Sequence, residues 1–81
     1  MRYHCTPRTD LDDLIGQGDT ANFEYGPLCQ AMKSGEELVL EDAASLPIML
    51  LTKLDCLCHG LVIAETGERI VPDSHFHLRF D

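Results

Sequence analysis

Two adjacent carboxylates follow a short apolar run near the middle of the chain. Residues 38–40 are Leu, Val and Leu, and Glu41 and Asp42 come directly after them. A buried strand ending in two acids is how many nucleotide hydrolases hold Mg²⁺ and orient the attacking water. The alternative is a solvated strand end beside a helix N-terminus, where negative charge is favoured. The residues themselves favour the solvated strand end.

Histidine and cysteine pairs offer a second kind of chemistry. Cys56 and Cys58 fall in a segment predicted to be helical, where side chains two positions apart point about 200° apart. Zinc needs four converging ligands, so this pair does not form a site. His75 and His77 share one face of a predicted strand and could chelate a metal weakly. We predict no metal and no cofactor, with a small metal-binding domain using His75 and His77 as an alternative.

Composition limits the classes of protein that the chain can belong to. The 81 residues, 44% hydrophobic and 25% charged, predict a single globular domain spanning 1–81. A net charge of −8 argues against nucleic-acid binding. No apolar run approaches the roughly 18 residues of a membrane span, and the N-terminus does not resemble a signal peptide. The prediction is therefore a cytoplasmic protein whose four cysteines are mostly buried apolar residues, with Cys58 in the core.

The elements that must position these residues follow from periodicity and from helix-capping signals. Asp10 is expected to cap the first helix and Ser45 the last, while Pro27 and Gly35 begin and end the middle one. The predicted order is a strand at 2–5, a helix at 9–16, a loop or irregular hairpin at 17–25, a helix at 26–35, a strand at 36–42, a helix at 45–60, a hairpin at 61–72 and a strand at 75–80. This order predicts an α/β fold with a small three-stranded parallel sheet, helices mainly on one face, and a β-hairpin.

The last predicted strand indicates which face of the sheet is exposed to solvent. Phe76, Leu78 and Phe80 alternate with polar residues, which is typical of a sheet buried on one side only. The polar residues of the outer strands predict one shared open face: Arg2, His4, His75, His77 and Arg79. Two interpretations remain for this face. It is a solubilised surface, or it binds an acidic or phosphorylated partner.

Three segments, taken in order, resemble a known family. They are "DLDDLIG", "YGPLCQAMKSGEELVLEDAASLP" and "LVIAETGERIVPDSHFHLRF", and together they cover nearly the whole chain. This pattern resembles the MoxR-type AAA+ ATPases, in particular their NorQ/CbbQ-like branch. The resemblance implies a partial AAA+ core in which Glu41 and Asp42 occupy the Walker B position.

Departures from that family change what the resemblance implies. The family's GxxxxGK[ST] phosphate-binding loop has no counterpart among the six glycines here. The acidic pair is Glu41 then Asp42, the reverse of the family order, and would be a degenerate Walker B. The sensor, arginine finger and lid segments have no counterpart either. The expected function is a non-catalytic interaction or regulatory module that does not bind ATP. A residual nucleotide-hydrolysis element completed by a partner chain is the alternative from the enzyme class.

The same resemblance predicts where a partner binds. In the family, the strand corresponding to 75–80 pairs on its outer side with the strand that carries the phosphate-binding loop. Without that neighbour, one edge of the sheet is open, and open edges tend to find another strand. We predict a homodimer or a protein partner at the 75–80 edge.

Overall fold

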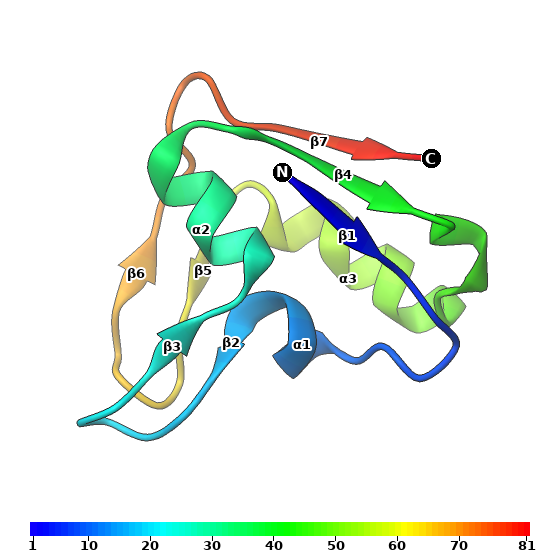
Figure 1. Ribbon diagram of the computed structural model, residues 1–81. Helices are drawn as coiled ribbons and strands as arrows, with labels where there is room; N and C mark the ends of the chain where they lie inside the picture. The colour runs from blue at the N-terminus through cyan, green and yellow to red at the C-terminus, as the bar shows by residue number, and fades with distance from the viewer.

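A three-stranded parallel sheet forms the centre of the computed structural model, which describes residues 1–81. Its strands are β1 (Arg2–His4), β4 (Glu37–Glu41) and β7 (His77–Phe80), in the spatial order β1-β4-β7. Figure 1 shows the three arrows running in the same direction, with β7 on one edge and β1 on the other. The predicted fold class, a small α/β domain around a parallel sheet, is confirmed.

The first α-helix begins, and the second begins and ends, at the predicted signals. α1 (Leu11–Ile15) starts after Asp10, whose carboxylate accepts from the Asp13 N–H in a reciprocal capping box. α2 (Pro27–Ser34) has proline in its first turn and ends at Gly35, which adopts the left-handed conformation with φ +75°.

The predicted start of the third helix at Ser45 is wrong. α3 spans Ile48–Leu57, and Ser45 belongs instead to the short 3₁₀ helix η1 (Ala43–Ser45). The Ser45 hydroxyl donates to the Asp42 carbonyl at 2.8 Å rather than capping α3. Pro47 explains the difference, because a residue that precedes proline is disfavoured in the α region. Leu46 is accordingly extended, with φ −68° and ψ 146°, and the α-helix starts only after the proline.

Two small antiparallel hairpins complete the chain. β2 (Gly16–Gln17) pairs with β3 (Glu24–Tyr25), so the segment 17–25 includes an irregular hairpin. The predicted hairpin at 61–72 contains β5 (Leu61–Val62) and β6 (Arg69–Ile70). The Thr20 hydroxyl donates to the Glu65 carbonyl at 2.8 Å, which joins the tips of the two hairpins. Both hairpins consequently lie at the same end of the molecule (Figure 1).

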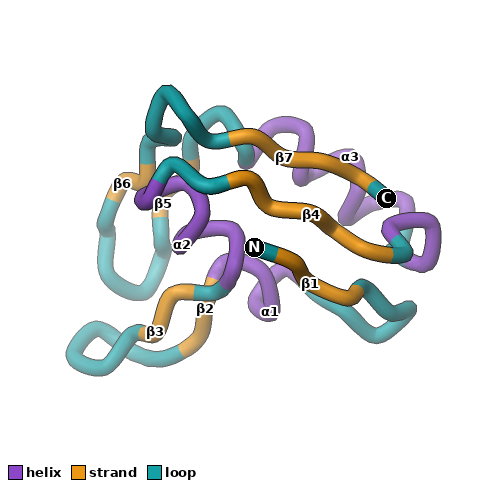
Figure 2. Tube along the Cα trace, turned by 45° about the horizontal axis from the view of Figure 1, so that its top comes forward, coloured by secondary structure: helices purple, strands orange, loops and turns teal.

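One face of the sheet carries the hydrophobic core. Leu38 and Leu40 of β4 are fully buried, in a cluster with Leu28 and Met32 of α2 and Leu54 of α3. Glu37 and Glu41 alternate with the two leucines, so their side chains lie on the opposite face. Figure 2 looks toward that open face, with α1 and α3 behind the strands. The prediction of a one-sided sheet is confirmed. No helix is long and apolar enough to cross a membrane.

Candidate functional site

Of the two acids at the end of β4, Glu41 forms an ion pair within the chain and Asp42 is exposed. Glu41 Oε2 lies 2.8 Å from Arg2 Nη1, an ion pair between neighbouring strands. Asp42 leaves the strand in the left-handed conformation, with φ +58°, and its carbonyl accepts from the Ser45 N–H and hydroxyl. Its side chain does not cap the following 3₁₀ helix. This arrangement supports the solvated strand end over a magnesium site.

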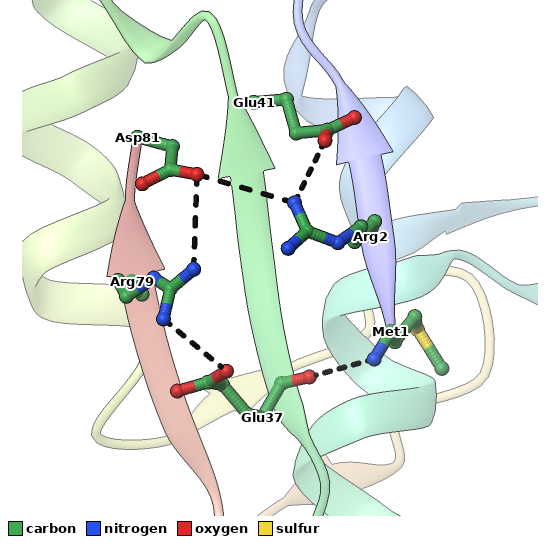
Figure 3. A network of polar contacts seen from close by, with 6 residues as sticks. All are labelled: Met1, Arg2, Glu37, Glu41, Arg79 and Asp81. Atoms are coloured by element: carbon green, nitrogen blue, oxygen red, sulfur yellow. Dashed lines mark hydrogen bonds and ion pairs between the residues drawn. The ribbon is translucent and has the colours of Figure 1, made fainter.

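The open face of the sheet is a network of opposite charges (Figure 3). Arg79 reaches Glu37 at 3.8 Å and Asp81 at 3.7 Å, and Arg2 lies 4.0 Å from the same Asp81 carboxylate. Two arginines thus face three carboxylates, counting Glu41. The face does not carry the positive charge that an acidic or phosphorylated partner requires. Its arginines act within the chain, which supports a solubilised surface.

A valine at the centre of this open face shows a further role of the arginines. Val39 is only 3% exposed, although it points away from the helices. Its neighbours in register are Arg2 on β1 and Arg79 on β7. Long arginine side chains can cover apolar surface with their methylene groups while the charged ends stay in water. The two arginines therefore replace a second layer of helices over the middle of the sheet.

The histidines do not converge on one point. His4 is exposed on β1, and His77 begins β7. His75 lies in the turn before β7 rather than in the strand, so the prediction that it shares a strand face with His77 is wrong. Its Nδ1 lies 3.2 Å from Asp73 Oδ1, and the Asp73 carboxylate also accepts from the His75 N–H. The turn takes His75 out of the alternation, and no group of three or more potential metal ligands forms.

The cysteines divide into two buried and two accessible thiols. Cys5 and Cys29 are fully buried, as predicted, whereas Cys56 is exposed and Cys58 is half-buried. The prediction that Cys58 is core is wrong, because α3 ends at Leu57 and Cys58 lies at the surface beyond it. Burial raises the pKa of Cys5, and it raises the pKa of Cys29 to about 11. Both buried thiols therefore stay protonated at neutral pH and are poor nucleophiles.

A polar cluster that the sequence did not reveal joins α2 to the two hairpins. The Tyr25 hydroxyl donates to the Glu68 carboxylate, and Lys33 Nζ donates to both, at 3.1 Å to Tyr25 and 2.9 Å to Glu68. Lys33 also lies 4.6 Å from the centre of the Tyr25 ring. These bonds raise the pKa of Lys33 and lower that of Glu68, so both remain charged. A lysine that stays charged at neutral pH cannot act as a base, so the cluster connects the elements structurally.

A groove between α3 and β7 is the second feature that the sequence did not reveal. It encloses about 510 Å³ and is lined on one side by Asp55, Cys58 and His59 from the end of α3. Phe76, Leu78 and Phe80 line the β7 side, and the preceding turn adds Asp73. No lysine or arginine lines the groove. Its walls are mainly apolar along the strand, where His77 also lies, and they carry Asp55 and His59 at the helix end and Asp73 in the turn.

The backbone of β7 is unpaired on the side away from β4. The N–H groups of His77 and Asp81 point to β4, where they donate to the Glu36 and Leu40 carbonyls. Successive residues of a strand direct their backbone groups to opposite sides, so those of Leu78 and Phe80 point outward. β7 pairs with β4 alone. Leu78 and Phe80 thus offer outward N–H and C=O groups at the edge beside the groove.

Comparison with known proteins adds no neighbour to this description. No protein-family model, no curated protein and no solved structure matches the chain.

Proposed function

We propose that the chain is a non-catalytic interaction module that binds another protein chain at the outer edge of β7. The observation that carries the proposal is the pair of outward backbone groups at Leu78 and Phe80, on a strand that pairs only with β4. An extended segment can add to such an edge through main-chain hydrogen bonds, while adjacent pockets select its side chains. The groove beside β7 supplies these pockets.

The opposite edge of the sheet is a weaker candidate. In β1, Arg2 and His4 are the residues that direct backbone groups away from β4. Arg2 is tied to Glu41, and charged side chains on an edge strand disfavour pairing with another strand. On β7, the residues whose backbone groups point outward are Leu78 and Phe80. Both are apolar, and Phe80 is 47% exposed. An exposed aromatic ring at an open edge favours β7 as the contact.

Three observations support the part of the proposal that describes the module as non-catalytic. The Glu41 carboxylate is held by Arg2, the buried thiols stay protonated, and Lys33 is held in its charged form. The resemblance of the sequence to MoxR-type AAA+ cores suggests an origin in which the sheet was kept and ATP binding was lost. Four free thiols fit a reducing compartment, so the proposal places the module in the cytoplasm.

One substitution tests the proposal without disturbing the sheet. Phe80→Pro removes the outward N–H of Phe80 and leaves the hydrogen bonds between β7 and β4 in place. Proline is tolerated in an edge strand where the N–H faces solvent. Phe80→Ala removes the same ring and keeps the N–H, so it is the matched control.

Association is measured by sedimentation at rising concentration and by quantitative recovery of partner proteins on the immobilised chain. We expect the wild type and Phe80→Ala to associate, with themselves or with a recovered protein, and Phe80→Pro to lose that association about tenfold or more. A wild-type chain that stays monomeric, and that recovers the same proteins as Phe80→Pro, would contradict the proposal.

A further inference from the structure

We propose that the occupant of the β7 edge is an extended segment of another protein, with lysine or arginine at the positions that face the groove. This inference rests on the proposed function, because it assumes that a strand pairs with β7. It adds the chemistry of that strand, which the groove determines.

The residues that line the groove favour a cationic occupant. Asp55 and Asp73 are its acidic residues, His59 and His77 also line it, and it has neither a lysine nor an arginine. The nearest strand arginine, Arg79, lies on the opposite face, where Glu37 and Asp81 hold it. The hydrogen bonds from His75 lower the pKa of Asp73, which keeps that carboxyl ionised at neutral pH. The net charge of −8 for the whole chain also attracts a basic segment.

Strand geometry aligns a bound segment with these groups. Alternate side chains of an added strand point to the same face and lie about 7 Å apart. One set therefore projects on the helix side of the sheet, where Phe76, Leu78 and Phe80 form the apolar wall. An apolar residue can pack on that wall, and a cationic residue two positions away from it can extend toward the acidic residues of the groove, Asp55 and Asp73. The other set of side chains projects over the open face.

A second copy of this chain is a poorer occupant of the same edge. A twofold axis would pair β7 with its copy antiparallel, and the two symmetric registers that overlap β7 most are centred on Leu78 and on Arg79. The first register places Arg79 opposite His77 of the second copy, and the second places Arg79 opposite Arg79 of the second copy. In the second register two arginines lie directly opposite each other, and like charges in that position are destabilising. Two copies would also bring together two chains of net charge −8.

The test uses a fluorescent peptide in which threonine alternates with lysine, valine and lysine, so that the last three share one face of a strand. A matched peptide carries glutamate in place of lysine. Binding is followed by anisotropy for the wild type, Phe80→Pro, and the double variant Asp55→Asn/Asp73→Asn. Asparagine keeps an oxygen at position 73 that can still accept from the His75 N–H. The double variant Asp12→Asn/Glu65→Gln removes the same charge from two exposed acids outside the groove.

The proposal predicts that the lysine peptide binds and the glutamate peptide does not. Asp55→Asn/Asp73→Asn should weaken binding about threefold to tenfold, and added salt should weaken it further. Asp12→Asn/Glu65→Gln should leave binding nearly unchanged, and Phe80→Pro should abolish most of it.

Equal loss of binding in the two acidic double variants would overturn the groove as the cation site. Binding of both peptides, lost in Phe80→Pro, would overturn the cationic partner and leave the proposed function standing. If the chain is dimeric and binds neither peptide, the occupant of the edge is a second copy of the chain.

Discussion

Arg2 Nη1 lies 2.8 Å from Glu41 Oε2, across the junction between β1 and β4. The carboxylate that a hydrolase would use to hold magnesium or direct water is thus paired with an arginine from the neighbouring strand. The same arginine lies in register with Val39 and helps to cover the centre of the open face. Arg2 therefore both pairs with Glu41 and contributes, with Arg79, to covering a sheet face that has no helices.

We expect no binding of ATP. Calorimetry with millimolar Mg²⁺ and ATP should show no saturable heat, because the chain has no phosphate-binding loop and Glu41 is held by Arg2. Arg2→Ala frees the Glu41 carboxylate and serves as a second test, in which we also expect no binding. A micromolar dissociation constant in either protein would show that the residual nucleotide-hydrolysis alternative is correct.

We expect zinc to leave the melting temperature nearly unchanged. His75 is held in the turn by Asp73, and no three potential ligands converge. An ion that bound only the native state, at a hundredfold excess over its dissociation constant, would add about 2.7 kcal/mol and raise the melting temperature by several degrees. Such a rise with one equivalent of zinc, lost in His75→Ala/His77→Ala, would instead establish the metal-binding alternative.

The ion pair between Lys33 of α2 and Glu68 of the second hairpin should make the free energy of unfolding depend on pH. The pKa of Glu68 is below its ordinary value of 4.5, so its contribution is present above pH 4.5 and is lost as the pH falls through the lower folded value. The pKa of Lys33 is above its ordinary value of 10.5, so its contribution is present below pH 10.5 and is lost at higher pH.

Urea unfolding of Glu68→Gln and of the wild type between pH 3 and pH 11 measures this dependence. The wild type should be more stable through the window between the two ordinary values, and the difference should shrink outside it. Glu65→Gln in the same hairpin is the control. A difference that does not vary with pH would mean that Glu68 acts through packing rather than through charge.

Core packing should dominate the free energy of unfolding. Leu54 of α3 is fully buried, and Leu54→Ala should cost about 2–5 kcal/mol. Ile48 of the same helix is 78% exposed, and Ile48→Ala should change the free energy of unfolding by no more than about 0.5 kcal/mol. Chemical denaturation of both variants checks this. Similar losses would imply that Ile48 is buried in an assembly.

Local signals in the sequence predicted most of the elements. Asp10, Pro27 and Gly35 act on residues within a few positions of themselves, so the ends of α1 and α2 could be predicted. Ser45 is also a local signal, but Pro47 overrides it by excluding Leu46 from the helix. The alternation of apolar and polar residues around Leu78 correctly predicted the one-sided sheet.

The groove and the Tyr25–Lys33–Glu68 cluster could not be predicted, because their residues are distant in sequence. Lys33 and Glu68 are 35 positions apart, and nothing near either residue indicates the other. Asp55 and Asp73 line the same groove only because α3 ends beside β7. Such relationships depend on how helices pack on the sheet, which single-residue patterns do not contain.

Amide hydrogen exchange in β7 reports directly on whether another strand pairs with its outer edge. In the monomer, the Leu78 and Phe80 amides should exchange rapidly, while the Asp81 amide, which donates to Leu40 at 3.0 Å, should be protected. When a partner strand binds, we expect the Leu78 and Phe80 amides to become protected and the Asp81 amide to stay protected. Protection of Leu78 and Phe80 in the monomer, or rapid exchange of both in a complex, would contradict this expectation.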